Sequence, residues 1–322
     1  MTTPLRVVFM GTPQFSVPCL QSLIADAHFE VVAVLTQPDR PSGRGQKLSP
    51  SPVAVVAEAA GIPVYKPQRL RMDTALKATL AQLNPDTFVT IAFGQILDAE
   101  VLAIPKLGTV NVHASLLPQY RGANPIQWAI LNGDAETGLT TMLTELGVDT
   151  GPMLLTHTQA ITPTDTTATL TEKLSEAAGP LLISTLQQLS AGTLTPTPQQ
   201  DTHATHAPKL SKADGTVDFN APANVVERRI RALQPWPGTT VMHQGNRLKL
   251  IASTVIPNHD HSSPSGTVLS ASTAGMLLAC GNNTVLEITQ VHPENRRPMD
   301  TLTWYRSLPT QDAPHIVTSL VL

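Results

Sequence analysis

The stretch that decides the fold of this chain is residues 109–122, which read Thr109-Val-Asn111-Val-His113-Ala-Ser115-Leu-Leu-Pro118-Gln-Tyr-Arg121-Gly122. The apolar, β-branched character of residues 109–113 predicts a buried strand. Because side chains two positions apart on a strand point to the same face, Asn111 and His113 would project together. Pro118 and Gly122 end the strand and turn the backbone just beyond it.

An amide beside an imidazole at the carboxyl end of a strand suits the stabilisation of an oxyanion and the transfer of a proton. On these residues alone a second interpretation stays open, because short motifs are weak signals. In that interpretation Asn111 caps a turn and His113 is a structural histidine with satisfied hydrogen bonds.

Strands and helices alternate through the first half of the chain. Further strands are predicted at residues 5–10, 30–36 and 87–92, and a helical pattern follows the first of them. This alternation predicts an α/β fold with a doubly wound, parallel, Rossmann-like sheet, in which ligands bind at the carboxyl ends of the strands. The first turn, residues 11–16, lacks the second and third glycines of a dinucleotide site, which argues against a nicotinamide oxidoreductase.

The last third of the chain has a different pattern. Residues 194–208 are rich in Thr, Pro and Gln, which is typical of a linker. A predicted helix at 223–233 is followed by short alternating strands, typical of a small β-barrel. We therefore expect a catalytic domain over residues 1–193, a linker over 194–208 and a second domain over 209–322.

Composition limits the class of protein. The chain has 322 residues, 41% of them hydrophobic, and a formal net charge of −3, so its overall charge gives no signature of nucleic-acid binding. The part from Lys209 onward carries a small excess of basic residues. Cys19 and Cys280 are the two cysteines, and no apolar run approaches about 18 residues, which favours a soluble protein of the reducing cytoplasm. We expect no metal site, because neither cysteine has a partner at ligand spacing.

From Ser115 to Trp128 the chain resembles the folate-dependent formyltransferases, in particular those that act on methionyl-tRNA. Their pattern S-L-L-P-x-Y-R-G-x-x-P is preceded by N-x-H and followed by a D-T-G turn, which is residues 149–151 here. The sequence departs from the pattern at Phe93, at Ala114 and within residues 295–299. Other matches run through nearly the whole chain, at Gly11-Thr-Pro13, Gln37-Pro-Asp-Arg40, Gly43-Arg44-Gly45, Ser51-Pro-Val53, Lys209-Leu-Ser-Lys212 and Pro235-Trp-Pro-Gly238.

The resemblance implies transfer of a formyl group from 10-formyltetrahydrofolate to the α-amine of methionyl initiator tRNA. It implies that the catalytic residues are Asn111, His113 and Asp149. It implies a folate site lined by Ser115, Leu116, Leu117, Pro118, Phe93 and Gly94. The basic loop at residues 38–50 and a C-terminal OB-like β-barrel would contact the tRNA, through Arg40, Arg44, Lys47, Lys209, Arg296 and Arg297.

Several alternatives stay open. A sister formyltransferase that acts on a nucleotide sugar or on glycinamide ribonucleotide shares the same three catalytic residues, and only the basic loop and the second domain favour tRNA. A non-catalytic tRNA-binding module is a third class, against which the intact trio argues. Asp149 alone also fits a turn in which Asp bonds its own backbone. Arg121 either holds its turn by hydrogen bonds or meets an anionic substrate. We further expect a monomer that binds no membrane.

Overall fold

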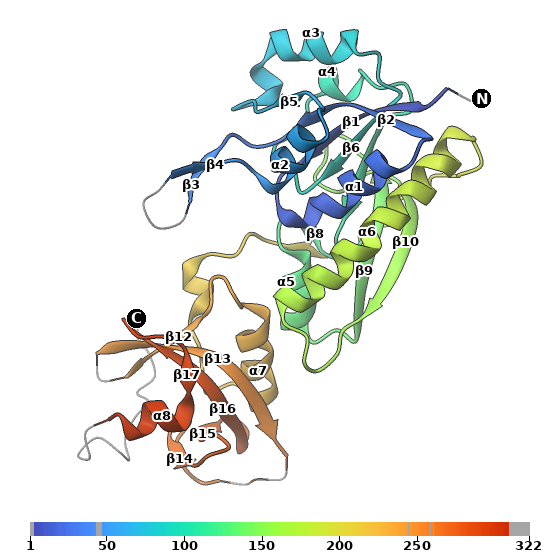
Figure 1. Cartoon of the computed structure of the whole chain (residues 1–322). Helices are drawn as coiled ribbons and strands as arrows, with labels where there is room; N and C mark the ends of the chain where they lie inside the picture. The colour runs from blue at the N-terminus through green and yellow to red at the C-terminus, as the bar shows by residue number, and fades with distance from the viewer. Residues whose placement is uncertain (1–2, 43–46, 244, 258, 260, 309–322) are drawn as a thin grey trace. The chain divides into compact units, whose positions relative to one another are not determined.

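The computed structural model describes residues 3–42, 47–243, 245–257, 259 and 261–308 (Figure 1). They pack into two units that interleave along the chain. The first unit contains the described residues up to Pro125, together with Glu136–Ala160 and Thr171–Ala207. The second contains Ile126–Ala135, Ile161–Leu170 and the described residues from Pro208 onward. The domain boundaries that the sequence suggests, at 193 and 208, stay a prediction.

The first unit is built on a seven-stranded sheet of order β10-β9-β7-β6-β1-β2-β5. Its strands are β1 (Leu5–Gly11), β2 (Phe29–Leu35), β5 (Val64–Tyr65), β6 (Thr87–Ile91), β7 (Thr109–His113), β9 (Glu136–Leu143) and β10 (Met153–Ala160). The five strands from β7 to β5 are parallel, which confirms the predicted α/β sheet. Strands β9 and β10 extend it in antiparallel fashion, so the sheet is mixed.

Burial along the strands explains this arrangement. All five residues of β6 are buried, as expected of a parallel strand covered on both faces. Exposure alternates along the second half of β10, which is typical of an edge strand with one solvated face. The strand order reverses between β1 and β6, and open α/β sheets bind ligands near such a reversal.

Three of the helices before residue 191 begin at a side-chain cap, formed by Ser51, Asp73 and Asp98. In α2, Ser51 Oγ accepts a hydrogen bond from Ala54 N at 3.0 Å and Pro52 is the first helical residue. Gly179 lets α6 approach α1 closely, because a Cβ there would lie 2.3 Å from Ser22 Oγ. The helices are α1 (Val17–Ala25), α2 (Pro52–Ala59), α3 (Thr74–Gln82), α4 (Ala99–Leu102), α5 (Pro125–Asn132) and α6 (Thr167–Ser190), with 3-10 turns η1 (Gln14–Ser16), η2 (Leu70–Met72) and η3 (Asp201–His203).

Two short strand pairs complete the first unit. Strands β3 (Arg40–Ser42) and β4 (Lys47–Ser49) form an antiparallel pair within the predicted basic loop. Strand β8 (Arg121–Gly122) pairs in parallel with β11 (His206–Ala207). Residues 194–207, for which the sequence predicts a linker, therefore run along the first unit and bond to it.

The second unit contains an antiparallel sheet of order β12-β13-β16-β15-β14, with β17 paired to β16, in agreement with the predicted OB-like barrel. Residues Ala223, Val226 and Ile230 of α7 follow helical spacing and are buried in the core of this unit. Its elements are η4 (Lys212–Gly215), α7 (Ala223–Ala232), β12 (Thr239–His243), β13 (Asn246–Ile256), β14 (Val268–Ala271), β15 (Met276–Cys280), β16 (Thr284–Pro293), β17 (Met299–Asp300) and α8 (Thr301–Arg306). Within the described ranges, no helix combines the length and apolar character needed to cross a membrane.

Candidate active site

Three neighbouring strands bring the predicted site residues to one edge of the sheet. Asn111 of β7 pairs with Thr90 of β6 on one side and with Met142 of β9 on the other. His113, two residues further along β7, pairs with Thr140 of β9. The loops that leave the parallel strands β6 and β7 therefore start beside one another, whereas β9 runs antiparallel and ends with Leu143 opposite Val110.

The amide of Asn111 has a fixed orientation. Thr90 Oγ1 donates a hydrogen bond to Asn111 Oδ1 at 3.0 Å. Because this bond engages the amide oxygen, Nδ2 points away from Thr90 and can donate a hydrogen bond to a ligand. The Asn111 residue is half-buried, so a ligand at the end of the strand can reach it.

The imidazole of His113 is nearly buried, with a side-chain exposure of 7%. Its Nε2 lies 2.9 Å from the carbonyl oxygen of Tyr120. Since a carbonyl oxygen only accepts, Nε2 must carry a hydrogen and donate it. Proton exchange at this ring is therefore left to Nδ1, which lies 3.6 Å from Asp149 Oδ2.

Asp149 reaches His113 from the loop after β9. Its backbone adopts a left-handed φ of 52°, which Asp tolerates better than most residues. Its Oδ2 accepts a hydrogen bond from Gly122 N at 2.9 Å. The carboxylate thus accepts a hydrogen bond from the turn that follows β7. This contact differs from the alternative interpretation of the sequence, in which Asp149 bonds only the backbone of its own turn. The fold brings the predicted trio together.

The 115–119 turn is held by hydrogen bonds within the protein. Ser115 Oγ donates to Gln119 O at 2.6 Å, and Thr140 Oγ1 donates to Ser115 O at 2.7 Å. Leu117 N donates to the same Thr140 hydroxyl at 3.0 Å. These bonds shape the turn and leave Leu116 and Pro118, both half-buried, as the part of it that a ligand can touch.

The loop after β6 carries the other two predicted folate residues. Phe93 is 4% exposed and packs in the hydrophobic core with Val8 and Met10, and its contact with folate stays a prediction. Its carbonyl oxygen accepts hydrogen bonds from Thr12 Oγ1 at 3.2 Å and from Gln37 Nε2 at 3.1 Å. The adjacent Gly94 is exposed and has a left-handed φ of 79°, so here the chain presents backbone to a ligand.

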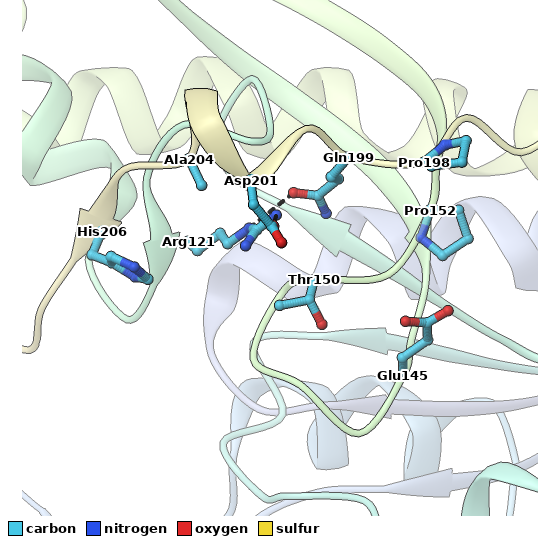
Figure 2. A pocket seen from close by; sticks show the side chains of 9 residues that line it. All are labelled: Arg121, Glu145, Thr150, Pro152, Pro198, Gln199, Asp201, Ala204 and His206. Atoms are coloured by element: carbon cyan, nitrogen blue, oxygen red, sulfur yellow. Dashed lines mark hydrogen bonds and ion pairs between the residues drawn. The ribbon is translucent and has the colours of Figure 1, made fainter.

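Arg121 forms side-chain hydrogen bonds to the segment around Gln199, and its contact with an anionic substrate stays a prediction. Its side chain is 7% exposed, its Nε donates to Gln199 Oε1 at 2.9 Å, and its Nη2 lies 2.9 Å from Asp201 Oδ1 (Figure 2). Gln199 is a residue that sequence reasoning missed, and a polar, proline-rich segment of a single sequence gives no signal for it. These residues border a cavity of about 640 Å³ lined by Arg121, Glu145, Thr150, Pro152, Pro198, Gln199, Asp201, Ala204 and His206.

The basic residues predicted to contact tRNA lie in both units. Arg40 is exposed in the first unit, and its Nη2 lies 3.4 Å from Gln37 Oε1. Arg44 and the side chain of Lys47 lie outside the described residues. The predicted tRNA-contacting residues of the second unit, Lys209, Arg296 and Arg297, are all exposed. Their contacts with tRNA stay a prediction.

The cysteines offer no nucleophile to this site. Burial raises the pKa of the Cys19 thiol to about 12, and burial likewise raises the pKa of Cys280 to about 12. A thiol with such a pKa carries almost no thiolate at neutral pH, and the thiolate is the reactive form. No group of three or more His, Cys, Asp or Glu side chains suited to a metal ion occurs in the part of the chain that the structure describes.

Comparison with known families matches both parts of the chain. The formyl transferase model matches residues 5–186, and the model of the formyl transferase C-terminal domain matches residues 209–309. A protein named methionyl-tRNA formyltransferase from Roseiflexus sp. (strain RS-1) is 45% identical over 305 residues, covering 95% of this chain and 93% of that protein. One of the same name from Pseudomonas fluorescens (strain SBW25) is 48% identical over 281 residues, covering 87% of each chain.

Solved structures share the fold at lower identity. The sugar 3N-formyl transferase WlaRD, solved with dTDP and 5-N-formyl-THF, has a TM-score of 0.68 at 17% identity and covers 92% of this chain and 100% of that chain. Glycinamide ribonucleotide transformylase 1 from Symbiobacterium toebii has a TM-score of 0.52 at 18% identity, covering 61% of this chain and 95% of that chain. With matches to both domain models and relatives that align along nearly their whole length, this chain belongs to the methionyl-tRNA formyltransferase family of formyl transferases.

Proposed function

We propose that this chain transfers a formyl group from 10-formyltetrahydrofolate to the α-amine of methionyl initiator tRNA. The observation that carries the proposal is an identity of 43–48% over most of the chain to bacterial proteins named methionyl-tRNA formyltransferase. The solved enzymes that act on sugars and on glycinamide ribonucleotide are less than 20% identical to this chain. They therefore support the assignment of the fold and not the choice of acceptor.

The reaction needs no protein nucleophile, because the amine of the acceptor attacks the formyl carbon. Negative charge then develops on the formyl oxygen, and Asn111 Nδ2 donates a hydrogen bond to it in our proposal. The Thr90 hydroxyl holds the amide in the required orientation, through the 3.0 Å bond to Oδ1. A fixed donor of this kind typically contributes about 10²–10³ in rate.

His113 moves the proton. The acceptor amine must lose one proton as the new C–N bond forms, and N10 of the donor must gain one as its bond to the formyl carbon breaks. Nδ1 is the ring atom that serves this exchange, because Nε2–H is bonded to the Tyr120 carbonyl. The Asp149 carboxylate lies 3.6 Å from Nδ1, so it attracts the positive charge that develops on the ring during proton transfer and leaves the direct contact with Nδ1 to substrate.

The formyl donor fits the edge of the sheet beside Asn111. Exposed backbone at Ala92 and Gly94 supplies polar groups, and the half-buried Leu116 and Pro118 supply apolar contact. A site of this composition suits a flat heteroaromatic ring with hydrogen-bonding edges. The exposed arginines and lysines of the two units would contact phosphates of the tRNA. We expect the chain to act as a monomer, in the cytoplasm where aminoacyl-tRNA is used.

The test is an acceptor panel with purified protein and 10-formyltetrahydrofolate. It compares charged initiator tRNA, uncharged initiator tRNA, elongator methionyl-tRNA, an amino-sugar nucleotide and glycinamide ribonucleotide. We expect formylation of charged initiator tRNA at a kcat/KM far above that of the other acceptors. Preferential formylation of the amino-sugar nucleotide or of glycinamide ribonucleotide would show that the acceptor is that compound and not tRNA. No transfer to any acceptor would refute the proposed formyltransferase activity.

A further inference from the structure

We infer that Gln199 is a positioning residue of the active site, which fixes the turn that carries Asp149. The inference rests on the proposed function for the reaction that it serves. Its contacts lie wholly within the first unit, and they come from a segment that the sequence predicts to be a linker.

The carboxamide of Gln199 joins two loops. Its Nε2 donates to the carbonyl oxygen of Asp149 at 2.8 Å and to that of Gly151 at 2.7 Å. An amide nitrogen has two hydrogens to donate, so these bonds use its full capacity. Its Oε1 accepts from Arg121 Nε at 2.9 Å, so the guanidinium holds the other end of the carboxamide (Figure 2).

These bonds close a ring around Asp149. Gln199 holds the main chain of Asp149, and Arg121 holds Gln199. The residue after Arg121 is Gly122, whose N–H donates to the Asp149 carboxylate at 2.9 Å. The backbone and the carboxylate of Asp149 are therefore held through the same short chain of residues, Gln199, Arg121 and Gly122, and the Gln199 carboxamide completes the ring.

The segment around Gln199 also bonds the loop that holds His113. On one side, Thr197 and Met153 exchange two backbone hydrogen bonds of 2.8 Å just beyond the Asp149 turn. On the other side, Thr205 Oγ1 accepts from the backbone N–H of Tyr120 at 2.8 Å. The carbonyl of this same Tyr120 accepts the His113 Nε2 bond. Residues 197–205 therefore tie together the supports of both members of the His113–Asp149 pair.

Asp149 has a reason to need this support. Its φ of 52° lies in the left-handed region, which is strained for a non-glycine residue though less so for Asp than for most, so hydrogen bonds to this turn stabilise it. Loss of both carbonyl bonds frees the turn and changes the 3.6 Å separation of the carboxylate from His113 Nδ1. A displacement of about 1 Å in a catalytic group costs about 10² in rate. Substrate binding would change less, because Gln199 supports the acid–base pair.

The test uses three variants of the full chain. Gln199→Glu keeps the size of the side chain and the acceptor for Arg121 but removes both donors to the carbonyl oxygens. Gln199→Asn keeps the amide and shortens it by one methylene group. Gln200→Glu is the matched control, because it adds the same charge one residue away, on an exposed side chain that makes no capping hydrogen bond to the 3-10 turn η3.

The first readout is methionyl-tRNA formylation. We expect kcat to fall about tenfold to a hundredfold in Gln199→Glu, with KM for both substrates within about threefold of wild type, a changed pH profile of kcat, and a smaller loss in Gln199→Asn. The control variant keeps the wild-type kcat. Wild-type kcat and pH profile in both Gln199 variants would overturn the inference, as would an equal loss in the control.

The second readout needs no substrate, so it separates this inference from the proposed function. In protein labelled with ¹⁵N-histidine, the ring-nitrogen signals of His113 are assigned by their loss in His113→Asn. We expect these signals to shift in Gln199→Glu and to stay at their wild-type positions in Gln200→Glu. Unshifted signals in folded Gln199→Glu would overturn the inference whichever acceptor the enzyme uses. A wild-type protein inactive on methionyl-tRNA would overturn the proposed function and leave this readout intact.

Discussion

Replacement of Asp149 by Asn tests the role of its charge with little change in shape. Asn keeps an oxygen that can accept the 2.9 Å hydrogen bond from Gly122 N, so the turn should keep its conformation. The variant loses the negative charge that lies 3.6 Å from His113 Nδ1. We therefore expect a folded protein with a thermal midpoint close to that of wild type and a lower kcat.

The size of the loss follows from the geometry. The two side chains are 7% and 16% exposed, so water screens their interaction only in part. At an effective dielectric constant of about 20, opposite unit charges about 4 Å apart attract each other by about 4 kcal/mol. Since about 1.4 kcal/mol corresponds to a factor of ten in rate, complete loss of this term is worth about 10³. Part of the attraction is present before the transition state, so we expect kcat to fall about 10²–10³-fold.

The assay is single-turnover formylation of methionyl initiator tRNA with saturating donor, which isolates the chemical step. Glu176→Gln is the control, because it removes one negative charge from an exposed position on α6. We expect this control to match wild type. A folded Asp149→Asn variant whose rate lies within about twofold of wild type would refute the electrostatic role of Asp149.

Three further outcomes follow from the packing. Because burial raises the pKa of Cys19 to about 12, iodoacetamide at neutral pH should leave this thiol unmodified in the native protein and label it after unfolding, as followed by mass spectrometry. Lys77 Nζ lies 2.7 Å from Asp98 Oδ2 and lowers the pKa of that carboxyl below 3.8, so Lys77→Met should lower the thermal midpoint at pH 7. The difference should shrink as the pH falls below 3.8 through the folded-state pKa, where the carboxylate is protonated; a difference independent of pH would contradict this. Gly122→Ala should cost about 1–3 kcal/mol in urea unfolding, because φ is +119° and a Cβ would lie 2.8 Å from a carbonyl oxygen of β11, whereas Gly192→Ala, with φ +67° and open space, should cost less.

Much of the strand that carries Asn111 and His113 could be predicted from local sequence. The apolar run at 109–113 forms β7, and the two-residue spacing of Asn111 and His113 follows from the strand period. The turn after it was also predictable, since Pro118 has no N–H to donate to a strand ladder, whereas Gly122 pairs in the short strand β8. These features depend on neighbours in the chain, which a single sequence displays.

The partners of the trio depend on contacts between distant segments. The contact between Asp149 and His113 could be predicted only from the family resemblance, because the two residues are 36 positions apart in the sequence. Gln199 lies in a segment without hydrophobic periodicity, and it acts through its side-chain amide on two carbonyl oxygens. The antiparallel strands β9 and β10 were not predicted from the sequence, and β10 is partly exposed along its length, so it lacks the buried apolar run that marks the parallel strands. The burial of Phe93 likewise follows from packing against β1 and not from its own neighbours.

The central claim is that this chain joins a formyl group to the methionine amine of charged initiator tRNA by means of the pair His113 and Asp149. The most direct measurement follows ¹³C-formyl-labelled 10-formyltetrahydrofolate with wild-type protein and with His113→Ala, and analyses the aminoacyl group by mass spectrometry. We expect ¹³C-formylmethionine from the wild-type protein and a loss of at least about 10² in rate for the folded variant. No label on methionine with wild-type protein, or an undiminished rate in the variant, would contradict it.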